Sequence, residues 1–151
     1  CVGNQIIFMP MQQHRARRVA RGLPDMRLPV VGDGVRGCFR LALGGAIVPC
    51  HDARILHEYR EVLARPRFGI PAPLADALLE QLKGEGAVEG AGPLRVHLPD
   101  RDDEAFLEVA LAAGARCLVT GNLRHYPVHS RQGMKVLDPG EFMSVYRSRA
   151  K

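Results

Sequence analysis

The segment Asp100–Pro127, DRDDEAFLEVALAAGARCLVTGNLRHYP, combines an acidic turn, a helix pattern and a strand pattern. It begins with a group of acids: Asp100, Asp102, Asp103 and Glu104. Apolar residues then recur at helical spacing, and Gly114 stands where a helix would end. Cys117–Thr120 is a short apolar run typical of a buried strand, and Gly121-Asn122 predicts a turn. Acids at a helix start and polar groups beyond the next strand predict a ligand site at one sheet edge.

Helix and strand patterns alternate through the rest of the chain. Helices are expected at Gly34–Leu43, from the N-cap Asp52 to before Pro66, at Ala72–Lys83 and at Pro139–Tyr146. Strands are expected at Ala46–Val48, Leu94–Leu98 and Met134–Leu137, and Ile6–Met9 is a further candidate. This alternation predicts an α/β fold with a parallel sheet, helices on both faces, and strand ends brought to one edge by right-handed crossovers.

Length and composition indicate one globular domain. The chain has 151 residues, is 46% hydrophobic and has no Trp, which favours an aliphatic core. Its four Cys show no C-x-x-C spacing, so we expect free thiols in a reducing compartment. The longest apolar run near the start is too short for a signal segment or a membrane span. We therefore expect a cytoplasmic protein with no membrane partner.

A formal net charge of +5 permits a polyanionic partner. Part of that charge lies in the basic run Gln12–Arg21, which carries no interleaved aromatic residue. This run has two interpretations, an RNA-contacting arm or a solvated leader, and the missing aromatic residues favour the leader. We treat residues 1–32 as an atypical basic leader.

Oxygen-bearing side chains on separate elements form the candidate chemical site. Glu58 lies next to the apolar stripe of its helix, Asp103 opens a later helix, and Asn122 follows a strand that ends in Thr120. Mg²⁺ and Mn²⁺ prefer such oxygen ligands, and they can clamp the oxygens of a phosphodiester displacement. Sequence alone leaves capping by Asp102 or Asp103 open, and Asn122 can be a turn former only.

Other side chains near this segment have further interpretations. Glu58 can also be a surface acid paired with Arg54. The loop after Asn122 carries Arg124 and His125, the candidate RNA contacts, and His125 can equally be inert. Histidines and cysteines here lack the four-ligand spacing of a structural zinc site. The glycine motifs of nucleotide-binding folds are absent from the sequence.

Four segments resemble PIN-domain proteins, and more narrowly the toxin components of bacterial toxin–antitoxin systems. They are HEYREVLARPRF (His57–Phe68), DRDDEAFLEVALAAGA (Asp100–Ala115), LVTGNLRHYP (Leu118–Pro127) and the ending VLDPGEF (Val136–Phe142). Each alone is a weak signal, but their combined order and spacing is specific. The resemblance covers Gly34–Tyr146.

The resemblance implies a three-layer α/β/α fold with a central, mostly parallel sheet, and a metal-dependent endoribonuclease. Carried over by position, Glu58 corresponds to the helix-borne acid of the family and Asp103 to the acid that opens the later helix. Asn122 stands where many relatives have Asp, and Thr120 corresponds to the preceding hydroxyl. By this analogy Glu58 and Asp103 hold Mg²⁺ or Mn²⁺, which activates a water against an RNA phosphodiester.

One motif of the family is missing from this sequence. Relatives begin with a buried strand that ends in Asp-Thr-Asn, and its Asp is a principal metal ligand. Counting back from Phe39 places that motif near Arg15, inside the basic run, and the aspartates before the matching region, Asp25 and Asp33, follow no apolar strand. The first strand is therefore expected to be missing or replaced, by hypothesis through a shifted reading frame or start.

These observations give one leading function, one alternative and a second rival, which is a plain α/β domain that binds a small-molecule ligand at the same strand edge. The first is a PIN-type endoribonuclease acting as the toxin of a toxin–antitoxin pair, with an ion site weakened by the absent Asp. The alternative is a catalytically inactive PIN-like module that binds RNA or an antitoxin protein. We expect a PIN-like domain at residues 33–147 and a basic tail at 148–151, and the family analogy adds a homodimer.

Overall fold

The computed structural model describes residues 5–10, 33–66, 69–84 and 86–149. In chain order its strands and helices are β1 (Gln5–Pro10), α1 (Asp33–Leu43), β2 (Ile47–Pro49), α2 (Ala53–Leu63), α3 (Ala72–Lys83), α4 (Glu104–Ala112), β3 (Cys117–Thr120), β4 (Val136–Leu137) and α5 (Pro139–Arg149). Three short 3-10 turns also matter below: η2 (Arg101–Asp103), η3 (Leu123–His125) and η4 (Val128–Ser130).

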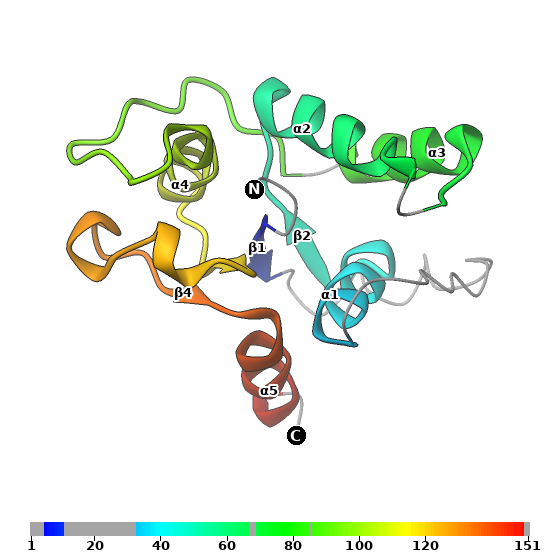
Figure 1. The fold of residues 1–151 in the computed structure, drawn as a ribbon. Coiled ribbons are helices and arrows are strands. Elements are labelled where there is room, and N and C mark those ends of the chain that lie inside the picture. The colour runs from blue at the N-terminus through cyan, green and yellow to red at the C-terminus, as the bar shows by residue number, and fades with distance from the viewer. Residues whose placement is uncertain (1–4, 11–32, 67–68, 85, 150–151) are drawn as a thin grey trace.

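The strands form one sheet in the order β2-β1-β3-β4 (Figure 1). Strand β3 pairs in parallel with β4, with Leu118 opposite Val136. Strand β1 lies between β2 and β3 and is antiparallel to both. The α/β class is confirmed, but the expectation of a mostly parallel sheet is wrong at β1. An apolar strand satisfies its backbone groups equally well in either direction, so its sequence does not reveal the direction.

The position of β1 also bears on the expected first strand. It comes from the 1–32 leader and fills the centre of the sheet, so a replaced strand agrees with the structure and a missing one does not. Its sequence, QIIFMP, contains no carboxylate. The basic run Gln12–Arg21 and the position near Arg15 lie outside the described residues.

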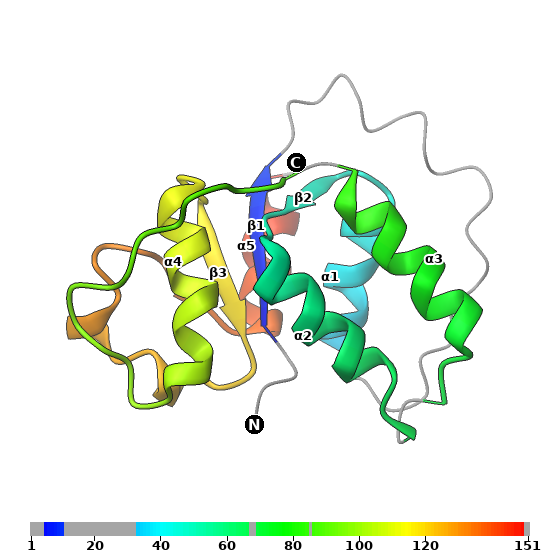
Figure 2. The same ribbon diagram turned by 90° about the horizontal axis from the view of Figure 1, so that it is seen from above.

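Helices pack on both faces of β3, and the alternation of its side chains shows why. Leu118 belongs to a core cluster with Leu107 of α4, and it is fully buried. Its neighbours Cys117 and Val119 belong to a second cluster with Phe142 of α5. Successive residues of a strand point to opposite faces, so β3 needs a cover on each side. Figures 1 and 2 show α2, α3 and α4 on one face and α1 and α5 on the other.

Local capping signals set the helix termini. Oδ1 of Asp52 accepts a hydrogen bond from the backbone N–H of Ile55 at 3.1 Å, which confirms it as the N-cap of α2. Helix α5 begins with a reciprocal capping box: the N–H of Glu141 donates to Asp138, and the N–H of Asp138 donates to Glu141. Gly114 adopts a positive φ of 59° just past α4, where a residue with a Cβ would be strained.

The strand expected at Leu94–Leu98 is wrong, because this segment pairs with no strand of the described chain. The alternation of apolar and polar residues in this segment nevertheless matches the burial of its side chains. Leu94 and Leu98 are buried while Val96 is 44% exposed. The backbone N–H of Leu98 donates to Oε1 of Glu104 at 3.1 Å, so a side chain replaces a neighbouring strand as its partner. An extended loop that packs one side on a core gives the same pattern as a strand.

The described cysteines are free thiols, as expected: Cys38, Cys50 and Cys117 are buried and unbridged. Burial raises the pKa of Cys38 to about 12, with a smaller contribution from Cys117. Burial also raises the pKa of Cys117, so the thiols of Cys38 and Cys117 stay protonated and act as small apolar side chains. Among the described helices, none is long and apolar enough to span a membrane.

Candidate functional site

Turn η2 places Asp103 at the start of α4. Oδ1 of Asp100 accepts a hydrogen bond from the N–H of Asp102 at 3.0 Å, so Asp100 caps this turn. The side chain of Asp103 makes no capping bond to α4 and is fully buried. Capping was one interpretation of Asp102 and Asp103, and the structure assigns that role to Asp100 instead. A fully buried carboxylate needs compensating partners from elsewhere.

Those partners come from the turn that follows β3. The backbone N–H of Asn122 donates to Oγ1 of the buried Thr120 at 3.0 Å, which shapes the turn out of the strand. Turn η3 then carries His125 back to the acidic turn, where its Nδ1 lies 2.6 Å from Oδ2 of Asp103. The hydroxyl of Tyr126 donates to the carbonyl oxygen of Asp103 at 3.2 Å. The carboxyl edge of β3 thus meets the start of α4, as the sequence predicted.

Asp100, Asp103 and His125 form a group with the chemistry of a metal site. One potential ligand atom from each lies within 4.8 Å of the other two. Asp103 is buried, and Asp100 and His125 are partly exposed, so the group opens toward solvent on one side. Two carboxylates and an imidazole are ordinary ligands of a divalent cation, so these residues fit such an ion.

The negative charges of Asp100 and Asp103 affect the pKa of one neighbouring side chain, Tyr126. Burial raises the pKa of the Tyr126 hydroxyl, and the charges of Asp103 and Asp100 raise it further. Tyr126 is itself fully buried against the group. The hydroxyl therefore remains a hydrogen-bond donor at all physiological pH values and holds the backbone of Asp103 in place.

Glu58 lies in an adjoining cavity rather than in this group. The cavity has a volume of about 420 Å³ and is lined by Glu58 of α2, by Arg101 and Asp102 of η2, and by Glu104 and Glu108 of α4. Burial raises the pKa of Glu58, and the negative charges of Glu61 and Asp102 add to that effect. The cavity and the Asp100–Asp103–His125 group meet at η2, because Asp102 borders the cavity and Asp103 is the next residue.

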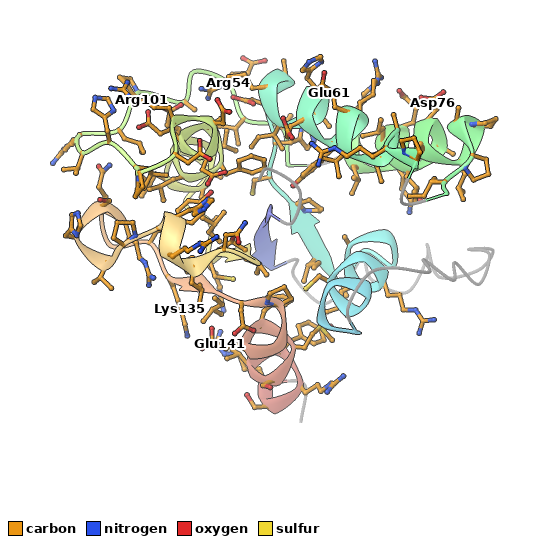
Figure 3. The ribbon with its side chains drawn as sticks, viewed as in Figure 1. Arg54, Glu61, Asp76, Arg101, Lys135 and Glu141 are labelled. Carbon is orange, nitrogen blue, oxygen red and sulfur yellow. The ribbon has the colours of Figure 1, made fainter. Side chains whose placement is uncertain are left out.

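Arg54 fastens α2 to α4 beside that cavity (Figure 3). Its guanidinium bonds Oε2 of Glu108 at 2.6 Å and Oδ2 of Asp52 at 2.9 Å. The bond to Glu108 is the main reason that the pKa of Arg54 is raised. The sequence left open a pair between Glu58 and Arg54. In the structure, the partners of the Arg54 guanidinium are instead Asp52 and Glu108. The pair fixes the helix that carries Glu58 against the helix that Asp103 opens.

The structure distributes the sequence-predicted residues as follows. It brings Asp103 and His125 into contact and joins Thr120 to the backbone of Asn122. Within the described ranges, the group of close carboxylate and imidazole ligand atoms does not include Glu58. Arg124 is exposed on η3, at the surface where an RNA contact was expected.

Sequence reasoning missed Asp100 as a member of the group and the direct contact of His125 with Asp103. The available signal for Asp100 was its spacing, because two acids three residues apart in one turn point to the same side. The contact of His125 had no local signal, because 22 residues separate the two side chains in the chain.

Comparison with known proteins gives one match. The family model described as a PIN domain matches residues 31–124, which is more than half of the chain. Curated proteins and solved structures gave no match. The matched region contains α2 with Glu58, the acidic turn η2, α4 and β3. The chain therefore belongs to the PIN domain family.

Proposed function

We propose that this protein is a metal-dependent endoribonuclease of the PIN type. PIN domains have a nuclease-type α/β fold and typically bind divalent metal ions. The observation that carries the proposal is the Asp100–Asp103–His125 group at the carboxyl edge of β3, next to the cavity lined by Glu58. Carboxylates that converge at such an edge suit a reaction at a phosphodiester.

Several side chains would serve the ion and the reacting water. Asp103 would hold Mg²⁺ or Mn²⁺, with Asp100 and His125 beside it and Glu58 across η2. A bound dication would supply Lewis-acid stabilisation of the phosphate charge and a more acidic water. Glu58 has a raised pKa, so its carboxylate accepts a proton more readily than an ordinary surface acid. Thr120 and Asn122 shape the turn that delivers His125.

Cationic side chains near the cavity would contact the RNA. Arg101 lines the cavity at η2, and Arg124 is exposed on η3 next to His125. Figure 3 shows Arg101 and Arg54 at the same end of the molecule, near α4 and the start of α2. The net charge of +5 would favour the approach of a polyanion. We propose Arg124 and His125 as RNA contacts, with Arg101 as an addition.

The wider biological assignment is also a proposal. By family analogy the chain would be the toxin of a bacterial toxin–antitoxin pair, cytoplasmic, neutralised by an antitoxin protein and assembled as a homodimer. The packing of helices on both faces of β3 supports the three-layer α/β/α arrangement. The segment 33–147 would be the PIN-like domain.

One observation favours the alternative, a catalytically inactive module that binds RNA or an antitoxin. Strand β1 fills the centre of the sheet, where relatives carry the acid of Asp-Thr-Asn, and its sequence QIIFMP has no acid. Fewer carboxylates weaken an ion site. Under this alternative the protein would bind RNA in a salt-dependent way without cutting it.

A metal titration on RNA separates the two functions. Single-stranded and structured RNA are incubated with the full chain at increasing Mg²⁺ or Mn²⁺, with and without EDTA. Cleavage that rises with the metal and disappears with EDTA and in Asp103→Asn supports the nuclease. Asp76→Asn is the matched control, because Asp76 is exposed on α3, at the opposite end of the molecule from Arg101 (Figure 3).

Thermal unfolding shows whether Asp103→Asn still folds. Metal at about 100 times its Kd should stabilise the wild-type chain by about 2.7 kcal/mol, and this gain should be absent from a folded Asp103→Asn variant. Cleavage that persists in EDTA or in Asp103→Asn would exclude the assigned site. RNA binding without cleavage at any metal concentration would favour the inactive module.

A further inference from the structure

A second cavity lies between α2 and α3, apart from the acidic turn η2, and has a volume of about 310 Å³. Its lining residues come from both helices and are Ala53, Leu56, His57, Arg60, Leu79 and Lys83. Helix α2 presents Arg54, Ile55 and Glu58 to the cavity of the proposed reaction site, and the two cavities share no lining residue. The α2–α3 cavity therefore lies on a different side of α2 and has no part in the proposed reaction.

The floor of the α2–α3 cavity is aliphatic and is held by the core. Leu79 is buried and belongs to a core cluster with Leu63 and Ala75, which packs α3 against α2. Figure 2 shows the two helices side by side, and they are in contact. Leu56 is only partly buried, so apolar surface remains open to a ligand. A cavity between two packed helices is a pre-formed site, as is usual for the binding of small molecules.

The polar side chains that line the α2–α3 cavity are all basic. They are His57, Arg60 and Lys83, and within the described chain no carboxylate is among the lining residues. Two acids stand beside this rim: Nε2 of His57 is 3.4 Å from Oε1 of Glu61, and Nζ of Lys83 is 2.5 Å from Oε1 of Glu80. Among the described residues, Arg60 has no carboxylate within ion-pair distance. Its guanidinium is therefore available to an anion in the cavity.

An aliphatic floor with a basic rim selects one kind of ligand. A guanidinium can bond both oxygens of a carboxylate, and an ammonium adds a second positive charge beside it. An aliphatic chain on that head would cover the open surface of Leu56, which is favourable because it removes apolar area from water. Glu61 and Glu80 repel further negative charge, so a single charge fits better than a polyanion. A cavity of about 310 Å³ is at the lower end for ligand sites, so the ligand is small.

We propose that the cavity between α2 and α3 binds a small aliphatic oxyanion, with its head at Arg60 and Lys83 and its chain on Leu56 and Leu79. A carboxylate and a phosphate monoester both offer such a head, and the experiment below separates them. We expect the carboxylate to bind more tightly, because it carries a single charge. The proposal goes beyond the ribonuclease function and does not rest on it, since the two cavities have no lining residue in common.

NMR titration of the ¹⁵N-labelled full chain with sodium hexanoate tests the proposal. The backbone amides of α2 and α3 around the cavity should shift in a saturable way, while those of η2 and η3 should not. Hexanol keeps the chain and lacks the charge, so it should bind at least about tenfold more weakly. Lengthening the acid from acetate to hexanoate should raise the affinity about threefold for each CH₂ that becomes buried. Hexyl phosphate is the second head, and whichever of the two ligands binds more tightly identifies the preferred oxyanion.

Two exposed residues give variants with opposite expected effects. Arg60→Gln should weaken hexanoate binding at least about threefold, because it removes the available cation. Arg147→Gln is the matched control, since Arg60 and Arg147 are both exposed arginines in the last turn of an 11-residue helix. Glu80→Gln should instead tighten hexanoate binding, because it removes the carboxylate that competes for Lys83. General damage to the fold would not tighten binding, so this variant separates a ligand site from a structural effect.

Several results would overturn the proposal. They are equal affinities for hexanol and hexanoate, amide shifts confined to elements other than α2 and α3, and unchanged hexanoate affinity in a folded Arg60→Gln variant. Shifts of the cavity amides by an oligouridine in EDTA, with none by hexanoate or hexyl phosphate, would also overturn it and assign the surface to RNA. None of these measurements uses RNA cleavage, so the proposal and the nuclease function can fail separately.

Discussion

His125 on η3 contacts Asp103 at the start of α4, with 2.6 Å between Nδ1 and Oδ2. Asp103 is fully buried, whereas the His125 side chain is 17% exposed. The contact joins the carboxyl edge of β3 to the acidic turn η2, so it positions two parts of the proposed site relative to each other. A buried carboxylate without such a partner would be strongly destabilising. The same contact therefore serves the stability of the fold and the geometry of the site.

Tyr126→Phe should destabilise the protein by about 1 kcal/mol, the typical net value of one hydrogen bond. The tyrosine hydroxyl donates to the backbone carbonyl oxygen of Asp103 at 3.2 Å, and the ring is fully buried. Phe keeps the apolar packing and removes the donor. Urea unfolding measures the change, and Tyr146→Phe is the control, because Tyr146 on α5 is only partly buried. Equal effects of the two substitutions would show that the Tyr126 hydroxyl contributes nothing specific.

Arg54→Met should destabilise the protein by about 1–3 kcal/mol, because it leaves the carboxylate of Glu108 without this partner. The Glu108 side chain is only 9% exposed, whereas that of Arg54 is 51% exposed. The exposed pair Lys83–Glu80 on α3 provides the matched control. Lys83→Met should change stability by less than about 0.5 kcal/mol, as is usual for surface ion pairs. A double-mutant cycle with Glu108→Gln isolates the pair, and a coupling energy near zero would contradict its role in joining α2 to α4.

Some elements of this fold could be predicted because their signals are local. Helix α3 was expected at Ala72–Lys83 and has these bounds. Pro71 and Pro73 stand at its start and Gly84 at its end, where the backbone preferences of these residues favour a terminus. The N-cap Asp52 and the strand at Cys117–Thr120 also depend on residues only a few positions apart. Such signals need no knowledge of the tertiary structure.

Other features depend on contacts that no local pattern encodes. The direction of β1 shows only in its pairing with β2 and β3, and both directions satisfy the backbone groups of an apolar strand. The segment Leu94–Leu98 alternates like a strand because it packs one side on the core, yet Glu104 supplies the partner of its backbone. The contact between Asp103 and His125 appears only after η2 and η3 have been placed in space. Family resemblance pointed to Glu58 and Asp103, and the geometry added Asp100 and His125 beside Asp103.

Gly86→Ala should destabilise the protein by more than about 2 kcal/mol, because strain and a clash add together. Gly86 has a φ of 78°, and a Cβ there would clash with the backbone carbonyl of Pro49 at the end of β2. The carbonyl of Gly86 also accepts a hydrogen bond from the N–H of His51 at 2.9 Å, so the backbone cannot move away freely. Gly90→Ala is the control: Gly90 has a φ of 68°, and a Cβ there would meet no atom within 4 Å. The Gly90→Ala variant should be destabilised only by the strain of a residue with a Cβ at positive φ, which costs about 1 kcal/mol. Equal losses in the two variants, measured by urea unfolding, would mean that Pro49 does not restrict this position.

Glu58→Gln should separate stability from activity. Burial, Glu61 and Asp102 raise the pKa of Glu58 in the folded protein, so the native state holds this proton more tightly than the unfolded chain does. Above the ordinary Glu pKa of about 4.3 the folded protein therefore loses stability as Glu58 ionises. Gln removes that loss, and the variant should be more stable at pH 7 by up to about 0.5 kcal/mol, a small value because the group is partly exposed.

The gain from Glu58→Gln should fade as the pH falls through and below the ordinary Glu pKa of about 4.3, where Glu58 becomes protonated in both states. Thermal unfolding across this range measures it, and Glu89→Gln is the control, because Glu89 is exposed and is not among the groups that shift the pKa of Glu58. In the same variant, metal-dependent RNA cleavage should fall at least about tenfold if the Glu58 carboxylate serves the ion or the water. A variant that gains stability and keeps full cleavage would remove Glu58 from the site and leave the ion to Asp100, Asp103 and His125. One that loses stability at pH 7 would contradict the raised pKa itself, because a carboxylate that prefers its neutral form cannot stabilise the fold by being charged.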